Sequence, residues 1–281
     1  MNCAVSDGPE APPDPAGDAV PYRPYVPEPT VSRGPQFAQL TLGAPLRWLA
    51  LGARDLIRAP GTALFFGTLF ALMGLVVLAV FRHAPAYTLA LCAGFLLLGP
   101  LLCLGLYDTS RRLERGEPPS LIDAVGAWLD NVSQIAIFGA ALLVLEMLWG
   151  RAALVVFAVS FDGMPDFAGS IAKLLDARHA GFVAAYLGVG ALFGGLIFSV
   201  SVIAMPLLLD RDTDAISAAL LSLRLCLSQP LTMLFWGLMI TTLVVLAMLP
   251  MFAGLIVIGP WLGHASWHAY RAALPPSGEP G

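Results

Sequence analysis

The stretches AGFLLLGP (residues 93–100) and AGLIVIGP (residues 253–260) share Ala, Gly, Gly and Pro in register, although they lie far apart in the chain. Arg111 and Arg271 follow the two prolines at the same distance. A Pro inside a membrane-spanning helix frees a backbone carbonyl and bends the axis, and a preceding Gly lets neighbouring helices approach closely. The repetition therefore predicts two apolar helices that bend at one depth, at Gly99–Pro100 and at Gly259–Pro260.

The composition supports a membrane location for such helices. The chain has 281 residues, of which 58% are hydrophobic and only 12% are charged, whereas about a quarter of the residues of an ordinary soluble protein are charged. This composition is typical of a multi-spanning membrane protein, so the lipid bilayer is the expected partner. The net charge of −4 and the absence of a basic stripe argue against nucleic acid as a partner.

Six apolar segments have the length that a bilayer core requires, about 20 residues each. They cover residues 60–81, 86–107, 133–159, 180–209, 230–249 and 251–270. A single helix over the last two segments would be about 60 Å long, far more than the ~30 Å core. A tight turn is therefore expected at MLPMF (residues 248–252).

The distribution of basic residues predicts the orientation. Eleven arginines fall on the side that holds the two termini and the 108–132 and 210–229 loops: Arg23, Arg33, Arg47, Arg54, Arg58, Arg111, Arg112, Arg115, Arg211, Arg224 and Arg271. The opposite side holds three basic residues, Arg82, Lys173 and Arg178. The positive-inside rule then places both termini in the cytoplasm, and the expected location is the bacterial inner membrane.

A short segment with helical spacing precedes each pair of spans, at residues 45–60, 119–134 and 213–230. We interpret these segments as amphipathic helices at the cytoplasmic surface, the third opened by a cap at Thr213 or Asp214. Extensions of the spans themselves are the alternative. The unit of surface helix, outward span and returning span then occurs three times, at about 45–115, 119–212 and 213–272, and Pro206 marks the bend of the middle, weaker copy.

The predicted fold class is thus an all-α polytopic membrane protein, with six transmembrane helices in a domain over residues 37–272. The segment before it, residues 1–36, holds nine prolines and hardly any aliphatic run, so it cannot bury enough apolar surface to offset the entropy of ordering. We expect it to be disordered, and we expect the same of the tail at 273–281.

Histidine and aspartate residues follow the three prolines at equivalent offsets. They are Asp108, then Asp210 and Asp214, then His264 and His268. If the repeats converge, these side chains meet near the cytoplasmic mouth as a set that suits Zn²⁺ or another divalent ion. The competing interpretation assigns the aspartates to helix capping and the histidines to an interfacial aromatic belt.

Two ionisable residues, Glu146 and Arg151, fall inside the third apolar segment. Charged groups at such positions are costly and usually face the bundle interior or water. Five residues apart on a helix they point in different directions, and Arg151 can reach the interface, so they form a poor pair. Glu146 is the better candidate for a proton or cation role, and a structural hydrogen bond is the alternative. Gly190 and Gly194 have the small-xxx-small spacing of a helix contact.

Four blocks of the chain resemble a known family: WLALGARDLIRAPG (48–61), GFLLLGPLLCLGLYDTSRRLERGEPPSL (94–121), MPLLLDRDTDAISA (205–218) and GPWLGHASWHAYR (259–271). They closely resemble the bacterial integral-membrane family catalogued as domain of unknown function 2189, in the family's order, over roughly residues 40–272. The resemblance implies an inner-membrane protein without an established activity, and it offers no catalytic residues to carry over.

The sequence alone leaves three functional hypotheses open. The first, which the sequence favours, is a non-enzymatic scaffold or accessory subunit of a membrane complex that acts through contacts with other membrane proteins, and the other two are alternatives to it. The second is a small-molecule or ion transporter or channel with Glu146 in its path. The third is a metal- or haem-binding redox subunit that uses His264 and His268. We expect no enzymatic activity and no cofactor, because no P-loop, GxGxxG, HExxH, GxSxG or CxxC motif stands where such chemistry needs it. The sequence does not give the oligomeric state.

Overall fold

The computed structural model describes residues 37–83, 88–160 and 180–275, without the side chains of 88–97 and 130. The helices are α1 (Ala44–Arg58), α2 (Pro60–His83), α3 (Thr88–Glu114), α4 (Leu121–Gly126), α5 (Val132–Ser160), α7 (Ala180–Ser201), α8 (Ala204–Asp210), α9 (Ala215–Ser228), α10 (Pro230–Met248) and α11 (Leu255–Ala273). A 3-10 turn, Leu129–Asn131, precedes α5. The all-α fold class is confirmed for the described residues, whereas the tail at 1–36 lies outside them.

Four of the described helical segments are long and apolar enough to cross a membrane. They are Pro60–His83, Val132–Ser160, Ala180–Asp210 and Pro230–Met248, and they correspond to four of the six expected spans. The other two expected spans, 86–107 and 251–270, correspond to α3 and α11. Both helices continue into a polar segment, which ends with Glu114 in α3 and contains His264, His268 and Arg271 in α11. The six-span arrangement therefore stays a prediction.

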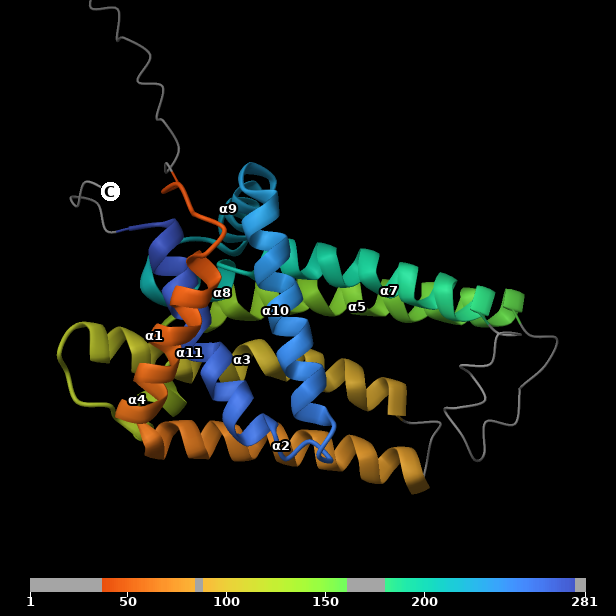
Figure 1. Ribbon diagram of the computed structural model, residues 1–281, viewed down its shortest axis with the longest axis horizontal. Helices are drawn as coiled ribbons and strands as arrows, with labels where there is room; N and C mark the ends of the chain where they lie inside the picture. Colours follow the sequence, from red (N-terminus) through yellow and green to blue (C-terminus); the bar gives the residue numbers. More distant parts are fainter. Residues whose placement is uncertain (1–36, 84–87, 161–179, 276–281) are drawn as a thin grey trace, which may run out of the picture. The chain divides into compact units, whose positions relative to one another are not determined.

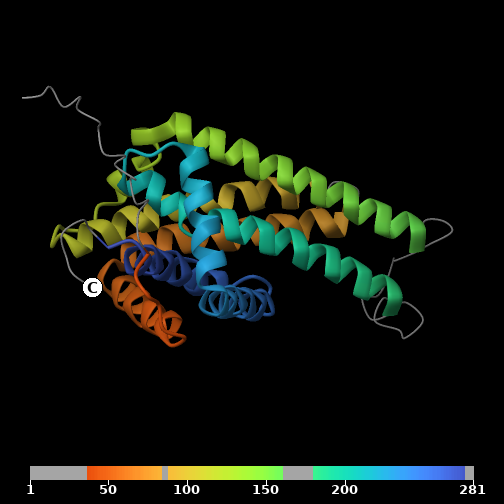
Figure 2. The ribbon, with the colours of Figure 1, turned by 90° about the horizontal axis from the view of Figure 1, so that it is seen from above.

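The helices run in two general directions. Figure 1 shows α2, α3, α5 and α7 extending along the same direction, whereas α10 crosses it, and Figure 2 shows α10 nearly end-on. The expected tight turn between α10 and α11 is confirmed at residues 249–254, where Met251 and Phe252 adopt φ angles of 51° and 66°. The third hairpin, α10–α11, is thus disposed differently from the α2–α3 and α5–α7 pairs.

The starts of the helices follow from local chemistry. Pro60 and Pro230 open α2 and α10 at the first helical position, where a missing N–H costs nothing. Asp214 caps α9, because its carboxylate accepts the backbone N–H of Ser217 at 2.9 Å. Of the two expected capping residues, Asp214 is therefore confirmed. The expected placement of α1 and α9 at a membrane surface stays a prediction.

The three repeat prolines do not play equal parts. Pro100 and Pro260 lie inside α3 and α11, as expected. Pro206 lies in the first turn of α8, after the chain leaves the helix at Val202–Ile203, because a Pro without an N–H cannot continue the hydrogen bonds of α7. Gly259 provides the expected close approach, since a Cβ there would lie 2.7 Å from the ring of Phe70, whereas at Gly99 a Cβ would meet nothing within 4 Å.

The core is centred on α11. This helix packs against α1, α2 and α3, and it buries Pro260, Leu262, His264, Trp267 and Tyr270 among its residues. Figure 1 shows α1 beside it. The two helices touch at their backbones, because a Cβ added at Gly52 would lie 2.7 Å from the amide nitrogen of Ala265. We call the interfaces of α11 with α1, α2 and α3 the α11 core.

The C-terminal boundary of the fold lies a little beyond the expected one. Leu274, which we placed in the disordered tail, is 2% exposed. The Arg211 guanidinium donates to the carbonyl of Leu274 at 3.1 Å and to that of Pro275 at 3.3 Å. Residues 273–275 therefore belong to the folded unit, and residues 276–281 lie outside the described residues.

Candidate functional site

Glu146 occupies the middle of α5, and its side chain points into the protein. The residue is 6% exposed, and its Oε2 atom is buried without a hydrogen-bond partner. A buried carboxylate without a partner is costly, because it loses the hydrogen bonds that water provides. The sequence-based expectation that Glu146 faces the interior is confirmed, and the alternative of a structural hydrogen bond finds no support at Oε2.

Glu146 lines a cavity of about 280 Å³, which we call the Glu146 cavity. Its walls come from α3, α5 and α7 and include Pro100, Trp149, Phe193 and Ser201. The Ser201 hydroxyl donates to the carbonyl of Ile197 at 2.7 Å, so its proton is engaged within α7. The cavity is therefore mostly apolar, with one carboxylate.

The glycines of α7 leave space beside this cavity. Gly190 and Gly194 both line it. A Cβ at Gly190 would come only as near as 3.8 Å to the indole nitrogen of Trp149, and a Cβ at Gly194 would meet nothing within 4 Å. The small-xxx-small spacing thus adjoins a cavity rather than a close helix contact. Arg151, one turn beyond Glu146, is exposed and does not pair with it.

A second polar group lies in the α11 core. It consists of Asp55 from α1, Ser110 from α3, and His264 and His268 from α11, and we call it the Asp55 cluster. Ser110 Oγ donates to Asp55 Oδ2 at 2.8 Å, and His268 Nε2 lies 2.8 Å from the same oxygen. His264 Nδ1 lies 2.8 Å from Ser110 Oγ. Asp55, Ser110 and His264 are all buried.

The hydrogen bonds of the Asp55 cluster fix the tautomer of His264. The single hydroxyl proton of Ser110 is directed at Asp55, so His264 must donate from Nδ1 to Ser110 Oγ. The other nitrogen, His264 Nε2, is then a lone-pair acceptor, and it is buried without a partner. The cluster therefore forms one hydrogen-bonded chain that leads from His264 through Ser110 and Asp55 to His268.

The environment also sets the charge of Asp55. Burial raises the pKa of the Asp55 carboxyl, but the hydrogen bonds from His268 and Ser110 and the charges of His268 and His264 together outweigh burial and lower the pKa below its usual value. Asp55 is therefore ionised at neutral pH. At the other end of this chain of hydrogen bonds, His268 lines an open pocket of about 480 Å³ together with Arg47 and Arg271.

The residues expected to form a metal set are distributed over separate contacts. Asp108 pairs with Arg111, and Asp214 caps α9 as described above. Asp210 accepts the Tyr270 hydroxyl at 2.7 Å. Among the described residues, no group of three or more His, Cys, Asp and Glu side chains is placed to hold a metal ion. The structure brings His264 and His268 into one cluster, but with Asp55 rather than with the expected aspartates.

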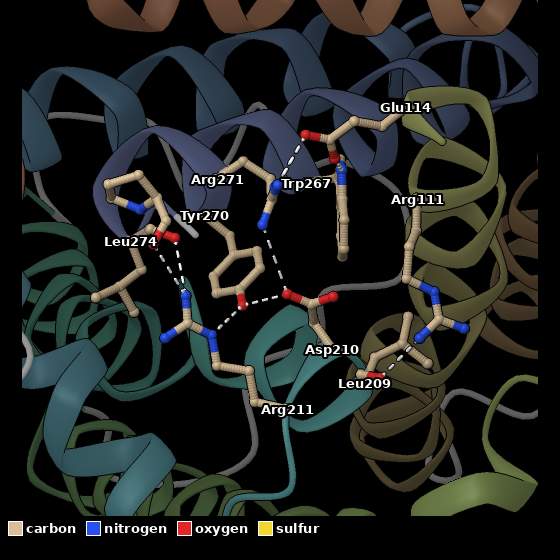
Figure 3. Close-up of polar contacts among 10 residues, drawn as sticks. Arg111, Glu114, Leu209, Asp210, Arg211, Trp267, Tyr270, Arg271 and Leu274 are labelled. Atoms are coloured by element: carbon tan, nitrogen blue, oxygen red, sulfur yellow. Dashed lines mark hydrogen bonds and ion pairs between the residues drawn. The ribbon is translucent and has the colours of Figure 1, made fainter. Parts of the chain in front are cut away.

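A third polar group, which we call the Tyr270 network, ties α3, α8 and α11 together (Figure 3). Besides Asp210, the Tyr270 hydroxyl binds Arg211 Nε, which donates to it at 3.1 Å. Glu114 accepts Arg271 Nε at 3.1 Å and Trp267 Nε1 at 3.1 Å. Arg271 also lies 3.8 Å from Asp210. Tyr270, Glu114, Asp210 and Arg271 thus each have at least two side-chain partners within the network.

Sequence reasoning missed Asp55, Ser110 and Tyr270. For Asp55 a signal existed, because helical spacing places it on the same face as Trp48 and Gly52, both of which are buried. A lone carboxylate on an apolar face indicates a buried partner. Ser110 and Tyr270 carry no comparable signal, since serine next to arginines and tyrosine near a helix end are typical of exposed positions.

Comparison with known proteins places part of this chain in a family. Residues 88–210 match the family described as "Predicted integral membrane protein (DUF2189)". No curated protein and no solved structure matches the chain. The matched segment runs from α3 to α8 and so contains the whole Glu146 cavity, whereas Asp55, His264 and His268 lie outside it. The expected resemblance is confirmed over this segment: the protein is a multi-pass integral membrane protein whose residues 88–210 match the DUF2189 family.

Proposed function

We propose that this protein is a non-enzymatic transporter or channel for a small molecule or ion, and that Glu146 lies in the path. One observation carries the proposal: a buried carboxylate with an unpartnered oxygen lines a cavity within a candidate membrane span. An ionisable residue at such a position is costly for folding and marks substrate and ion pathways in membrane proteins. The cavity gives the unpartnered oxygen a place to meet a cation or a proton.

The neighbouring residues support the same role. Pro100 bends or weakens α3 where it borders the cavity, and Gly190 and Gly194 leave open space on α7. An interrupted helix next to small residues can move at lower cost than a tightly packed one, because fewer side-chain contacts must break. The path of a transporter needs such a movable wall.

The non-enzymatic part of the proposal rests on the Asp55 cluster. Aspartate, histidine and serine are the residues of hydrolytic triads, but a nucleophilic serine must reach the substrate carbonyl. Ser110 is 0% exposed, and its proton is directed at Asp55 rather than at a histidine. This arrangement supports a structural role for the cluster.

The direct test is flux through the purified protein in liposomes. We expect proton uptake, driven by a potassium diffusion potential and followed with an entrapped pH dye, to fall at least about tenfold in Glu146→Gln, the scale of losing one buried charge contact. Glu117→Gln is the matched control, because it removes the same charge from an exposed position after α3. Equal proton flux in the wild type and in Glu146→Gln would reject a proton path through Glu146.

We also infer that α3 and α11 insert, giving six membrane helices in three consecutive pairs with both termini in the cytoplasm of a bacterium. The first part of α3, Thr88–Tyr107, has no charged residue, which supports insertion. The insertion of α3 is tested by placing a single cysteine at position 117, after replacing the four native cysteines by alanine. Labelling from one side of the membrane then shows on which side residue 117 lies. Six spans place residue 117 on the side of the N-terminus, whereas insertion of only the four strongest segments places it on the opposite side.

The second candidate is a scaffold or accessory subunit of a membrane complex. It is favoured by the apolar face of α10, where Leu231, Leu234 and Leu238 are all more than 60% exposed at helical spacing. Lipid or another membrane protein can cover this face. Stoichiometric co-purification of a partner in mild detergent, lost when the three leucines are replaced by alanine, would support this function in place of transport.

A further inference from the structure

We propose that the Glu146 cavity binds a small monovalent organic cation of the alkylammonium class. The inference deepens the proposed function and rests on it, since it names the class of molecule that passes or is sensed at Glu146. It is argued from the charge, the wall chemistry and the size of the cavity.

The charge of the cavity selects a cation. Glu146 is the one ionisable side chain among the described residues that line it. Arg151 is exposed and does not neutralise it, and Oε2 has no hydrogen-bond partner. A buried carboxylate of this kind favours a positive ligand, because the pair then replaces the interactions lost with water. An anionic ligand would gain no such pairing, because no cationic side chain is among the described residues that line the cavity.

The walls favour an organic cation over a metal ion. Trp149 and Phe193 line the cavity from opposite helices, α5 and α7, and aromatic side chains attract ammonium groups through their ring faces. Ca²⁺ and Mg²⁺ need about six oxygen ligands. Among the described residues that line the cavity, the oxygen-bearing side chains are Glu146 and Ser201, so a dehydrated metal ion would lack most of its shell.

The size limits the ligand. The cavity measures about 280 Å³, just below the range of about 300–1,000 Å³ for sites that hold drug-sized molecules. Leu142 and Ile197 complete the apolar lining. A compact ammonium ion with a few methyl or ethyl groups buries its alkyl surface against these walls and places its charge beside Glu146.

The experiment is calorimetric titration of the full-length protein in detergent with choline, tetramethylammonium and ethylammonium. 3,3-Dimethylbutan-1-ol, the neutral isostere of choline, is the matched ligand control. We expect binding of at least one cation and none of the neutral isostere. Glu146→Gln is expected to weaken binding at least about tenfold, and Trp149→Leu about fivefold, the scale of a partly desolvated cation–π contact. Glu117→Gln should bind as the wild type does.

The outcomes separate this inference from the transport function. Binding by none of the three cations, or equal binding by the wild type and Glu146→Gln, overturns the organic-cation inference. Proton flux that still depends on Glu146 would then leave the transport function standing with the proton as the transported ion. Loss of both the binding and the Glu146-dependent flux would reject both proposals. If a variant unfolds, the neutral isostere tested on the wild type still decides whether charge is recognised.

Discussion

The α11 core and the α5–α7 pair are built in opposite ways. In the core, a Cβ at Gly52 would collide with the backbone of α11 and a Cβ at Gly259 with the ring of Phe70, and buried polar groups bind one another. In the pair, α7 buries none of its residues, Gly194 faces open space, and Glu146 Oε2 has no partner. The difference indicates that the core holds the fold, whereas the pair carries a site that can change shape.

The largest expected effect comes from filling the contact between α1 and α11. Gly52→Ala places a methyl group 2.7 Å from the Ala265 nitrogen and 2.9 Å from the Trp261 carbonyl, and backbone atoms cannot turn aside. We expect a loss of about 3 kcal/mol in the free energy of unfolding, measured as a lower Tm in detergent. Gly188→Ala in α7, which meets nothing within 4 Å, should leave Tm unchanged or raise it by the helix propensity of alanine. Equal effects of the two changes would remove the distinction between the regions.

A smaller loss is expected from Asp55→Asn. The carboxylate accepts two hydrogen bonds in a buried site. Its loss should lower the free energy of unfolding by about 2 kcal/mol at pH 7. Because the pKa of folded Asp55 lies below its usual value, its charge stabilises the protein above about pH 4 and this stabilisation is lost as the pH falls further. The Tm difference between wild type and variant should therefore shrink below about pH 4. Asp212→Asn, at an exposed position, is the control, and a difference independent of pH would contradict the assigned charge.

The smallest effect is expected from Tyr270→Phe, which removes one hydroxyl from the Tyr270 network. Asp210 and Arg211 each lose one hydrogen bond but keep or regain other partners at the edge of the fold. We expect the free energy of unfolding to fall by about 1 kcal/mol, measured as a lower Tm in detergent. Tyr186→Phe, in α7 with its ring 5.7 Å from that of Phe182, should cost less. A larger loss at Tyr186 would mean that α7 is held more firmly than its exposure indicates.

Much of the fold could be predicted from the sequence, because the length of an apolar segment and the presence of Pro or Asp at the start of a helix are local signals. The extents of α2, α5 and α10 differ from the expected spans by at most a few residues. The turn around Pro250 could be predicted because a single helix over the last two apolar segments would be longer than the bilayer core is thick. The disposition of the third hairpin could not be predicted, since the crossing of α10 depends on which side chains interlock over long sequence distances.

The candidate site was predictable only where one residue broke a pattern. Glu146 stood out as a charge within an apolar segment, and the structure places it in a cavity. The expected set of His264, His268 and the aspartates relied on three equivalent repeats. The repeats are not equivalent in space, so the aspartates find arginine, tyrosine and backbone partners instead. Asp55 lies beside the histidines because α1 packs directly on α11 at this level.

The central position of α11 has a consequence for how the protein is made. Its three main packing partners, α1, α2 and α3, precede it by more than a hundred residues, so the ribosome delivers the organising helix long after them. Until then Asp55 and the glycine surfaces of the early helices lack their permanent contacts. A nascent chain that stops before α11 would therefore expose these surfaces, and we expect it to be less stable than the finished protein.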